Sequence, residues 1–498
     1  KSNSFCTLLG HNPRLTTAFT TIMLRRVGIR AAATTAPEMT KSELIIAKEK
    51  RFGAANYKPL PVVFSKASKS TVLSPEGHRY LDFLSGYGAV SQGHCHPRLV
   101  RAVMKQIKRV TLVSRAFYSV QFGEYAEYIT KLLGYEKVLP MNTGAEGVET
   151  ALKLARKWGY QKKKIPANQA KIVCCTGNFH GRTFGPIAMS NDPSSYAQYG
   201  PHLPGFIRVE YGNAEQLEKV FKKHGKTICG FICEPIQGEA GVVIPPAGYL
   251  QAVRKLCTKH NILYIDDEVQ AGLGRTGKML AVEHEEVRPD VVILAKALGG
   301  GVMPVAAVLA DAKHMVFEPG THGSTFGGSP LASALATEAL KVLVEENMCQ
   351  RATLRGLQLS AGLKQLKADF PFIKQVRCRG LFAAIEVHPR FLGGKAGYRL
   401  MELVKDNGVL TKVTHGTTLR ITPPLVVTEK EMIRGLAALR KSLETLQAEG
   451  EAKAAAGLAK EVVKRAPAKK KATVRRAVRK VVTQAKKKAA AKKRVAKK

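Results

Sequence analysis

The amino-acid sequence predicts an α/β protein in which a mostly parallel sheet flanked by helices precedes a smaller α+β region. Two observations lead to this prediction. Apolar runs alternate with helical patterns from Val138 to about residue 330, which is typical of strands joined by crossover helices. Each apolar run is followed by polar or glycine-rich residues. Ligands of open α/β sheets bind outside the carboxyl ends of the strands, so these polar residues are the candidate functional residues.

Five segments are expected along the chain. Residues 1–40 are rich in arginine, and their first acidic residue is Glu38. This composition is typical of a mitochondrial transit peptide and predicts the mitochondrial matrix as the location, whereas an ordinary disordered leader would favour the cytoplasm. Residues 41–90 are expected to form an N-terminal segment of one helix and short strands, and residues 91–330 a large α/β domain. Residues 331–450 are expected to form a small α+β domain, and residues 451–498 a disordered Lys/Ala/Arg-rich tail.

Several elements can be placed more closely. A helix is expected over Ser42 to Lys50 with Ser42 as its N-cap, a short strand over Val62 to Phe64, and a final helix from about Thr428 to Leu446. Apolar strands of the large domain are expected at residues 171–175, 228–233, 262–265 and 291–294.

Length and composition exclude several classes of protein. The 498 residues are 45% apolar, which is enough for a large core. No run of about 18 apolar residues occurs, so no transmembrane helix and no membrane association are predicted. The nine cysteines include no CxxC pair, which favours reduced thiols over a disulfide framework. No spacing of His, Cys, Asp and Glu suggests a metal site.

The positive charge is concentrated at the C-terminus. Residues 451–498 hold 19 Lys/Arg and 2 Glu, a net charge of +17 out of +41, which leaves +24 for the rest of the chain. Such charge density without aromatic side chains is suited to non-specific, salt-sensitive nucleic-acid binding. The alternatives are a solvated tail, a gene-model fusion or a nuclear signal. The tail resembles those of linker histones in its basic runs, which are Lys469–Lys471, Arg475–Arg476, Lys486–Lys488 and Lys492–Arg494.

Lys296 is the first candidate catalytic residue. It closes the apolar run Val291–Leu294 and stands just before Gly299–Gly301. Burying a lysine is unfavourable unless its amine is used, and a desolvated lysine has a lowered pKa that favours the neutral, nucleophilic amine. For a lysine considered alone, a side chain that extends to water at the strand end is the better interpretation.

Asp267 strengthens the catalytic interpretation of Lys296. It follows a buried run and precedes Lys296 by 29 residues, or one βα unit, so both side chains can point into one cleft. A carboxylate there could keep a heteroaromatic nitrogen protonated. With a phosphate-binding turn at Gly144 and a stacking ring at Phe179, the set fits pyridoxal phosphate. Each feature also has an ordinary interpretation when taken alone. The turn could be a common helix cap, and Phe179 could be an aromatic lid. Glu239, in the polar loop after the apolar run at 228–233, could be an ordinary surface residue.

Longer stretches point to a family. They are Gln92–Pro97, Ser114–Tyr118, Leu139–Gly144, Leu154–Tyr160, Glu234–Val242, His322–Thr325 and Thr414–Gly416. By these stretches, the chain from about residue 45 to 445 resembles the class III, fold-type I pyridoxal phosphate-dependent aminotransferases, and within them the branch that acts on ornithine. The resemblance implies a seven-stranded type of sheet in the large domain.

The resemblance also implies roles around the cofactor. Lys296 would form the Schiff base and Asp267 would hold the pyridinium nitrogen. Gln270 would touch the 3-oxygen. Phe179 would stack on the ring beside His180, which stands where a tryptophan is often found. The phosphate would be held by two groups of residues: Thr143, Gly144 and Ala145 of the turn, and Ser324 and Thr325 of the partner subunit. A homodimer, or a higher assembly, with composite active sites is therefore expected.

The substrate side carries over in the same way. Tyr57 and Arg182 match the family's holders of the ornithine α-carboxylate, and Tyr87 matches the tyrosine associated with ornithine specificity. Arg420 would take the α-carboxylate of glutamate, with Glu239 covering it when ornithine is bound. The implied reaction is ping-pong transfer of the δ-amino group of L-ornithine to 2-oxoglutarate, which gives glutamate and glutamate 5-semialdehyde, the precursor of pyrroline-5-carboxylate. The alternative is acetylornithine or 4-aminobutyrate as the amino donor.

Overall fold

The computed structural model describes residues 39–465, 475–476, 479–480 and 483. The chain forms two compact units, residues 1–63 and residues 64–498. The predicted transit peptide lies outside the described residues, and so do the lysine runs at 469–471, 486–488 and 492–494.

The described residues of the first unit, 39–63, form the helix α2 (Lys41–Phe52). Its N-cap is Thr40, not Ser42 as predicted, because Thr40 and Glu43 form a reciprocal capping box that satisfies two backbone N–H groups. The strand predicted at residues 62–64 is absent, and the first strand of the second unit, β1, covers Lys66–Ser68.

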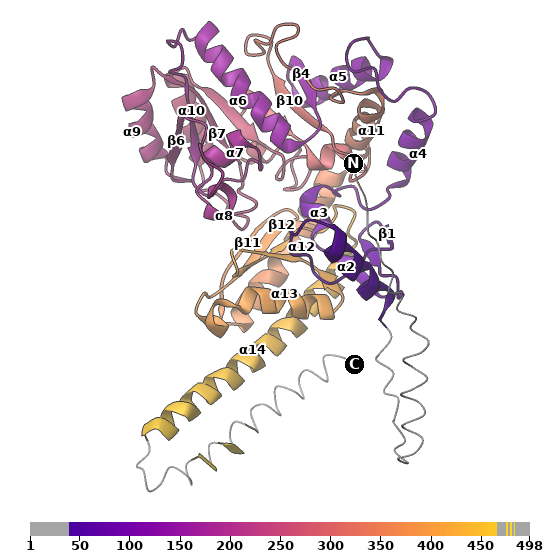
Figure 1. The fold of residues 1–498 in the computed structure, drawn as a ribbon, viewed down its shortest axis with the longest axis vertical. Coiled ribbons are helices and arrows are strands. Elements are labelled where there is room, and N and C mark those ends of the chain that lie inside the picture. The colour runs from indigo at the N-terminus through magenta and orange to yellow at the C-terminus, as the bar shows by residue number, and fades with distance from the viewer. Residues whose placement is uncertain (1–38, 466–474, 477–478, 481–482, 484–498) are drawn as a thin grey trace, which may run out of the picture. The chain divides into compact units, whose positions relative to one another are not determined.

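A seven-stranded sheet forms the centre of the large domain, as expected (Figure 1). Its strands are parallel except for one antiparallel strand, β10, which lies between β4 and β9. The order across the sheet is β4 (Lys137–Met141), β10 (Ala306–Ala310), β9 (Val291–Leu294), β8 (Leu263–Asp267), β7 (Ile228–Cys233), β5 (Lys171–Cys175) and β6 (Phe206–Val209).

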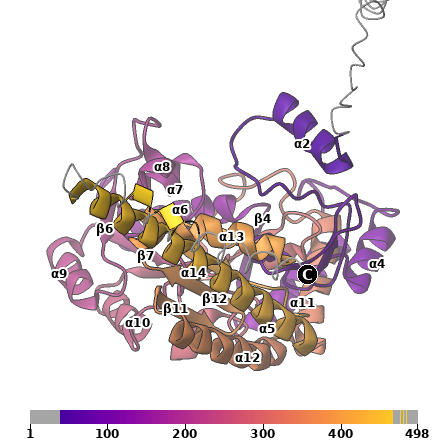
Figure 2. The same ribbon diagram turned by 90° about the horizontal axis from the view of Figure 1, so that it is seen from below.

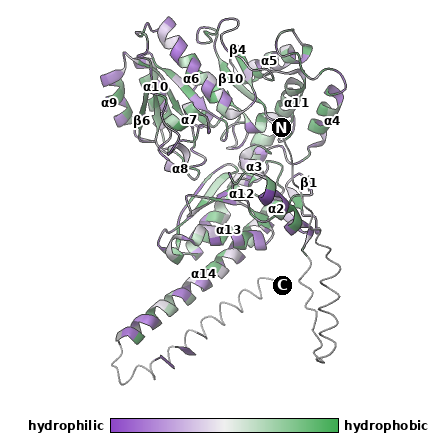
Figure 3. Cartoon of the chain, viewed as in Figure 1, coloured by the Kyte–Doolittle hydropathy of each residue, from purple (hydrophilic) through white to green (hydrophobic). Residues whose placement is uncertain are grey.

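Helices cover this sheet on both sides. The helix α6 (Gly144–Gln161) packs its buried face, which includes Ala151, Leu154 and Ala155, against the central strands. Hydrophobic residues gather in the strands, whereas the outer helices carry many hydrophilic residues (Figure 3). The other helices of this domain are α4 (Pro97–Gln106), α5 (Val120–Leu133), α7 (Phe184–Met189), α8 (Pro193–Tyr196), α9 (Ala214–His224), α10 (Tyr249–Lys259) and α11 (Pro330–Glu345).

Two four-stranded sheets make up the smaller part of the second unit. One has the order β11 (Ile373–Arg379), β12 (Phe382–Val387), β15 (Thr418–Ile421), β14 (Lys412–Thr414). The other has the order β1, β2 (Thr71–Leu73), β3 (Arg79–Asp82), β13 (Val409–Leu410). Because β3 pairs with β13 in parallel, the strands predicted within a separate segment 41–90 belong to a sheet completed by the C-terminal region.

The helices of the smaller part are α12 (Met348–Asp369), α13 (Ala396–Asp406) and α14 (Glu429–Arg465). The helix α14 runs 37 residues without interruption (Figures 1 and 2). It therefore continues past the predicted end at 446 and crosses the predicted boundary at 450, so residues 451–465 are helical and not disordered as expected. Alanine and lysine, which dominate that stretch, favour helix without requiring a packed face, and no described residue there is buried.

The described residues contain eight free cysteines. Within the same residues, no helix is long and apolar enough to cross a membrane, and no group of three His, Cys, Asp or Glu side chains could hold a metal ion.

Candidate active site

A cavity of about 480 Å³ opens at the carboxyl ends of the central strands. The turns that follow β4, β5, β8 and β9 all contribute to its wall, as the prediction from the strand ends required. Its lining includes most of the predicted cofactor residues, namely Thr143, Gly144, Ala145, Phe179, His180, Asp267, Gln270 and Lys296.

Lys296 begins the 3₁₀ turn η2 (Lys296–Gly299) that follows β9. Its φ of 44° lies in the left-handed region, an unfavourable conformation for a lysine that the surrounding structure must impose. Burial lowers the pKa of the Lys296 amine, and the nearby Asp267 carboxylate acts in the opposite direction. The amine is thus shifted toward its neutral, nucleophilic form, as predicted from its place in the sequence.

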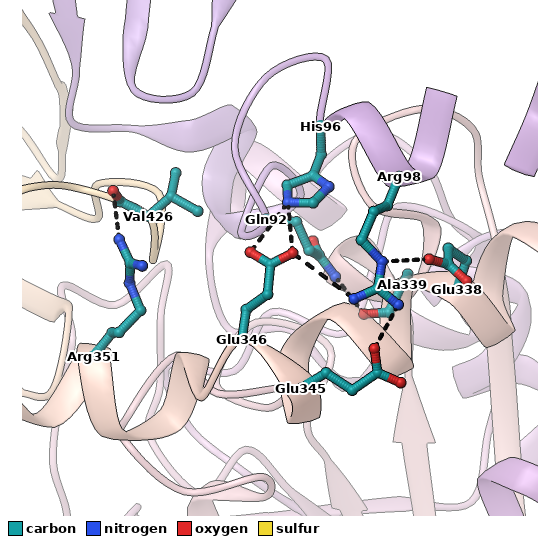
Figure 4. Close-up of polar contacts among 9 residues, drawn as sticks. All are labelled: Gln92, His96, Arg98, Glu338, Ala339, Glu345, Glu346, Arg351 and Val426. Carbon is teal, nitrogen blue, oxygen red and sulfur yellow. Dashed lines mark hydrogen bonds and ion pairs between the residues drawn. The ribbon is translucent and has the colours of Figure 1, made fainter. Parts of the chain in front are cut away.

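The turn that carries Lys296 is supported from α11. The Nε2 of the buried Gln92 donates to the carbonyl of Ala297 at 2.9 Å and lies 3.3 Å from that of Ala339 on α11. Beside it, Arg98 pairs with Glu338 at 2.6 Å on the same helix (Figure 4). These contacts connect the cavity wall to a helix that lies behind it.

Asp267 ends β8 and is 3% exposed. Its Oδ2 lies 2.6 Å from Nδ1 of His180, and its Oδ1 accepts the backbone N–H of Val269 at 3.2 Å. The carboxylate therefore sits in the cavity wall with a fixed orientation. Side chains alternate along a strand, so the preceding Asp266 points to the other side of the sheet.

The N-terminus of α6 forms a further part of the cavity wall. Thr143 is its N-cap, and the side chains of Thr143 and Glu146 satisfy one another's backbone N–H groups. Within the described contacts, the N–H groups of Gly144 and Ala145 have no acceptor, so they remain available to an anion. A Cβ at Gly144 would lie 2.9 Å from Cγ1 of Val269, which explains the need for glycine.

Phe179 lines both this cavity and a second one of about 540 Å³, which Arg182 also lines. The guanidinium of Arg182 lies 5.2 Å from the centre of the Phe179 ring, and its Nη1 donates to Oγ of Ser195 at 2.9 Å. Arg182 and Glu239 both line the second cavity. The second cavity thus presents a cation and an anion beside the cofactor-sized space.

Arg420, Glu239 and Tyr87 lie close together. Arg420 lies on β15, is buried and forms an ion pair with Glu239. Its guanidinium is 4.9 Å from the centre of the Tyr87 ring. Tyr87 has a φ of 58° inside the short turn α3 (Ser85–Gly88), and its carbonyl accepts from Nε2 of Gln270 at 3.1 Å.

Among the predicted residues of the second unit, Ser324, Thr325, Tyr87 and Arg420 line neither cavity. The Oγ of Ser324 accepts a hydrogen bond from Asn142 at 2.7 Å, and Thr325 is exposed. Neither lines the cavity of its own chain. Tyr57 belongs to the first unit, where it is 77% exposed.

Glu234 also lines the cavity, but the sequence reasoning assigned it no role. It is 4% exposed, and its carboxylate accepts the N–H groups of Phe179 and Gly238, each at 3.0 Å. Burial raises the pKa of its carboxyl to about 7, and the nearby His180 opposes that rise. The same signal that identified Asp267, an acid at the end of an apolar strand, could have found it.

These residues fit pyridoxal phosphate. The free N–H groups at the start of α6 suit its phosphate, Phe179 offers a ring face, Asp267 offers a carboxylate, and Lys296 offers an amine that burial makes less basic. Together with the sheet topology, they define the site of a fold-type I pyridoxal phosphate enzyme.

Comparison with known proteins gives the family. Residues 52–443 match the model of the class-III aminotransferases, and the chain belongs to this family. It is 54% identical over 407 residues to the mitochondrial ornithine aminotransferase of Arabidopsis thaliana, which covers 81% of this chain and 86% of that protein.

Solved structures agree. The ornithine aminotransferase of Toxoplasma gondii superposes with a TM-score of 0.80 at 41% identity, over 83% of this chain and 97% of that one. The acetylornithine aminotransferase of Elizabethkingia anophelis gives a TM-score of 0.74 at 44% identity, over 81% and 99%. Because both activities occur among similar structures, the amino donor has to be argued from the site.

Proposed function

We propose that the protein is an ornithine aminotransferase, which transfers the δ-amino group of L-ornithine to 2-oxoglutarate by a ping-pong reaction. The observation that carries this proposal is the Arg420–Glu239 ion pair beside the ring of Tyr87, close to Lys296. Relatives about 50% identical that are named ornithine aminotransferases support it.

The cofactor residues have separate tasks in this proposal. Pyridoxal phosphate, when bound, supplies an electron sink for the charge that develops at the substrate carbon. Asp267 would hold its ring nitrogen protonated, Phe179 would stack on its ring, and Gln270 would contact its 3-oxygen. Its phosphate would be bound by the N–H groups of Gly144 and Ala145 next to Thr143, where the positive end of the α6 dipole would add to the attraction.

Lys296 moves the proton. Its Nζ would take a proton from the substrate carbon that bears the transferred nitrogen and would later give a proton back. The lowered pKa of this amine favours the neutral form that the step requires.

The ion pair accounts for the use of two unlike substrates. Ornithine must enter with its δ-amine toward Lys296, so its α-carboxylate is held at the far end by Arg182. Glutamate must enter with its α-amine toward Lys296, so its α-carboxylate needs a cation nearby. Arg420 provides that cation once Glu239 moves away, and the closed pair removes it for ornithine.

A substrate panel tests the proposal. Purified protein loaded with pyridoxal phosphate is assayed with ornithine, acetylornithine and 4-aminobutyrate, each with 2-oxoglutarate. The proposal requires ornithine to have the highest kcat/KM. A preference for acetylornithine or 4-aminobutyrate would replace ornithine as the donor, and Tyr87→Ile should shift preference toward 4-aminobutyrate.

We also propose a homodimer with composite sites. Ser324 and Thr325 lie outside the cavity of their own chain, which fits a role at the phosphate of the neighbouring subunit. Several large apolar side chains are exposed, including Phe117 at 76%, Tyr118 at 104% and Phe326 at 58%, which a second copy would cover. Sedimentation analysis at micromolar concentration should give twice the mass of the chain, and a monomer would contradict this proposal.

A second function is proposed for the C-terminal tail. Its net charge of +17 over residues 451–498 is suited to many phosphate contacts on nucleic acid. Binding of the full chain to duplex DNA should weaken steeply with salt and be lost when residues 451–498 are deleted. Binding that survives the deletion would place the contact elsewhere. For location, the mitochondrial relatives favour the matrix, which imaging of a C-terminally tagged chain would test.

A further inference from the structure

The imidazole of His180 is completely enclosed in the wall of the cofactor cavity. Its side chain is 0% exposed, and its Nδ1 lies 2.6 Å from Oδ2 of Asp267. An ionised carboxylate only accepts hydrogen bonds, so Nδ1 carries the proton and donates it. Such charge-assisted bonds are short and strong, and they fix the direction of both groups.

Asp267 has few other contacts that could orient it. Its second oxygen accepts only one described hydrogen bond, a longer one of 3.2 Å from the N–H of Val269. His180 is thus the one described side chain that bonds this carboxylate, and it approaches from the strand β5 side of the cavity.

His180 is itself held from the neighbouring turn. Glu234 accepts the N–H of Phe179 at 3.0 Å and so fixes the backbone just before His180. The same carboxylate accepts the N–H of Gly238, one residue before Glu239. The turns after β5 and β7 are therefore connected by a buried acid that itself lines the cavity.

One feature of His180 argues against a purely structural role. Its Nε2 is buried and has no hydrogen-bond partner among the described residues. Leaving a polar atom unsatisfied is unfavourable, and an apolar side chain of similar size would avoid it. An imidazole here therefore leaves one buried nitrogen unsatisfied, which is understandable if its Nδ1 serves Asp267.

We propose that His180 is a positioning residue which, anchored through Glu234, orients the carboxylate of Asp267 toward the ring nitrogen of the cofactor. The inference rests on the cofactor roles proposed above and does not depend on which amino donor is used. It predicts that the N–H at the Nδ1 position, and not the aromatic ring as such, is the required feature.

Three variants of His180 test this proposal. His180→Asn keeps an N–H donor near the Nδ1 position, whereas His180→Leu removes it, and His180→Gln places its amide near Nε2 instead. The dissociation constant of pyridoxal phosphate is measured by equilibrium dialysis against each apoenzyme. Loss of the bond should weaken cofactor binding by about tenfold to a hundredfold in His180→Leu and His180→Gln, and His180→Asn should restore most of it.

Two further measurements separate positioning from stability. The pH midpoint of the visible absorbance change of the bound cofactor should shift in His180→Leu and His180→Gln and return toward the wild-type value in His180→Asn. His284→Leu is the matched control, because His284 is a partly buried histidine that bonds the carbonyl of Thr276 outside both cavities. It should lower the unfolding temperature of the apoenzyme and leave cofactor affinity unchanged.

The outcomes are distinct. If all three His180 variants bind pyridoxal phosphate as the wild type does, with an unchanged absorbance midpoint, the positioning role is refuted. If His180→Asn is as weak as His180→Gln, the N–H at Nδ1 is not what matters, and the inference also fails. Should His180→Leu not fold, the comparison of His180→Asn with His180→Gln decides. If the three variants show the expected affinity pattern but the wild-type enzyme does not use ornithine, only the proposed function is refuted.

Discussion

Replacing Glu239 with glutamine should shift the substrate preference from ornithine toward glutamate. The Arg420 guanidinium is 3% exposed and its described side-chain partner is Glu239, so in the closed state the carboxylate neutralises a buried charge. Glutamate binding has to break this charge-assisted contact, which is worth roughly 1.5–3 kcal/mol. In Glu239→Gln that requirement largely disappears, so kcat/KM for glutamate should rise relative to kcat/KM for ornithine.

The size of the change follows from the same contact. Each 1.4 kcal/mol corresponds to about tenfold, so the ratio of the two specificity constants should change by about tenfold to a hundredfold. An uncovered Arg420 would also attract the α-carboxylate of ornithine and turn its α-amine toward Lys296. Some loss of δ-selectivity is therefore expected in the same variant.

Stopped-flow absorbance of each half-reaction provides the assay, because ornithine and glutamate can then be measured separately. Glu386→Gln is the matched control, since Glu386 on β12 pairs with Arg377 at 2.7 Å and with Lys374 at 2.6 Å but lines neither cavity. The control should leave the ratio unchanged. A Glu239→Gln enzyme with the wild-type ratio would refute the proposed exchange of Arg420 between substrates.

Three other variants give independent tests. Lys296→Ala should abolish turnover and the visible absorbance of lysine-bound cofactor, and an active variant would remove Lys296 from the chemistry. Burial raises the pKa of the paired acids Asp266 and Glu268, and that of Glu268 rises to about 8. Glu268 therefore keeps its proton in the folded protein, whereas in the unfolded chain it loses that proton at about pH 4.3. Its stabilising contribution is present below that pH and is lost as pH rises toward about 8. Chemical unfolding between about pH 5 and pH 8 should therefore show a smaller decline in stability for Glu268→Gln than for the wild type. A decline equal to that of the wild type would contradict the raised pKa of Glu268. Lys163 donates to the carbonyls of Ile228, His260 and Asn261, so Lys163→Met should lower the free energy of unfolding by roughly 1–3 kcal/mol, with the exposed Lys162→Met as the control that should not.

The sequence was most informative where burial is complete. The strands β7, β8 and β9 are buried at every position, so their apolar runs stood out, and the acid or lysine that ends each run was conspicuous. Asp267 and Lys296 were found in this way, and the cavity brings them together. Glu234 satisfies the same criterion, but its function depends on two backbone N–H groups that no local pattern reveals.

Long-range pairing and weakly specified segments were less accessible. The two-residue strand β13 exists because it pairs with β3, more than 300 residues earlier, and nothing in its own sequence shows this (Val409 opposite Leu81). The extension of α14 past residue 450 was missed because an Ala/Lys-rich stretch is compatible with both helix and disorder. The roles of Arg182, Glu239 and Arg420 came from family resemblance. Arg182 and Glu239 lie in polar loops, where charged residues are usually exposed, and Arg420 stands in a strand too short to be conspicuous in the sequence.

The most direct test of the central claim follows the transferred nitrogen. Ornithine labelled with ¹⁵N at the δ-position is incubated with the enzyme and unlabelled 2-oxoglutarate, and the glutamate formed is analysed by mass spectrometry. The proposed orientation, with the α-carboxylate at Arg182 and the δ-amine at Lys296, predicts that the label appears in glutamate. Unlabelled glutamate from this substrate would show that the α-amine is transferred and would contradict the account.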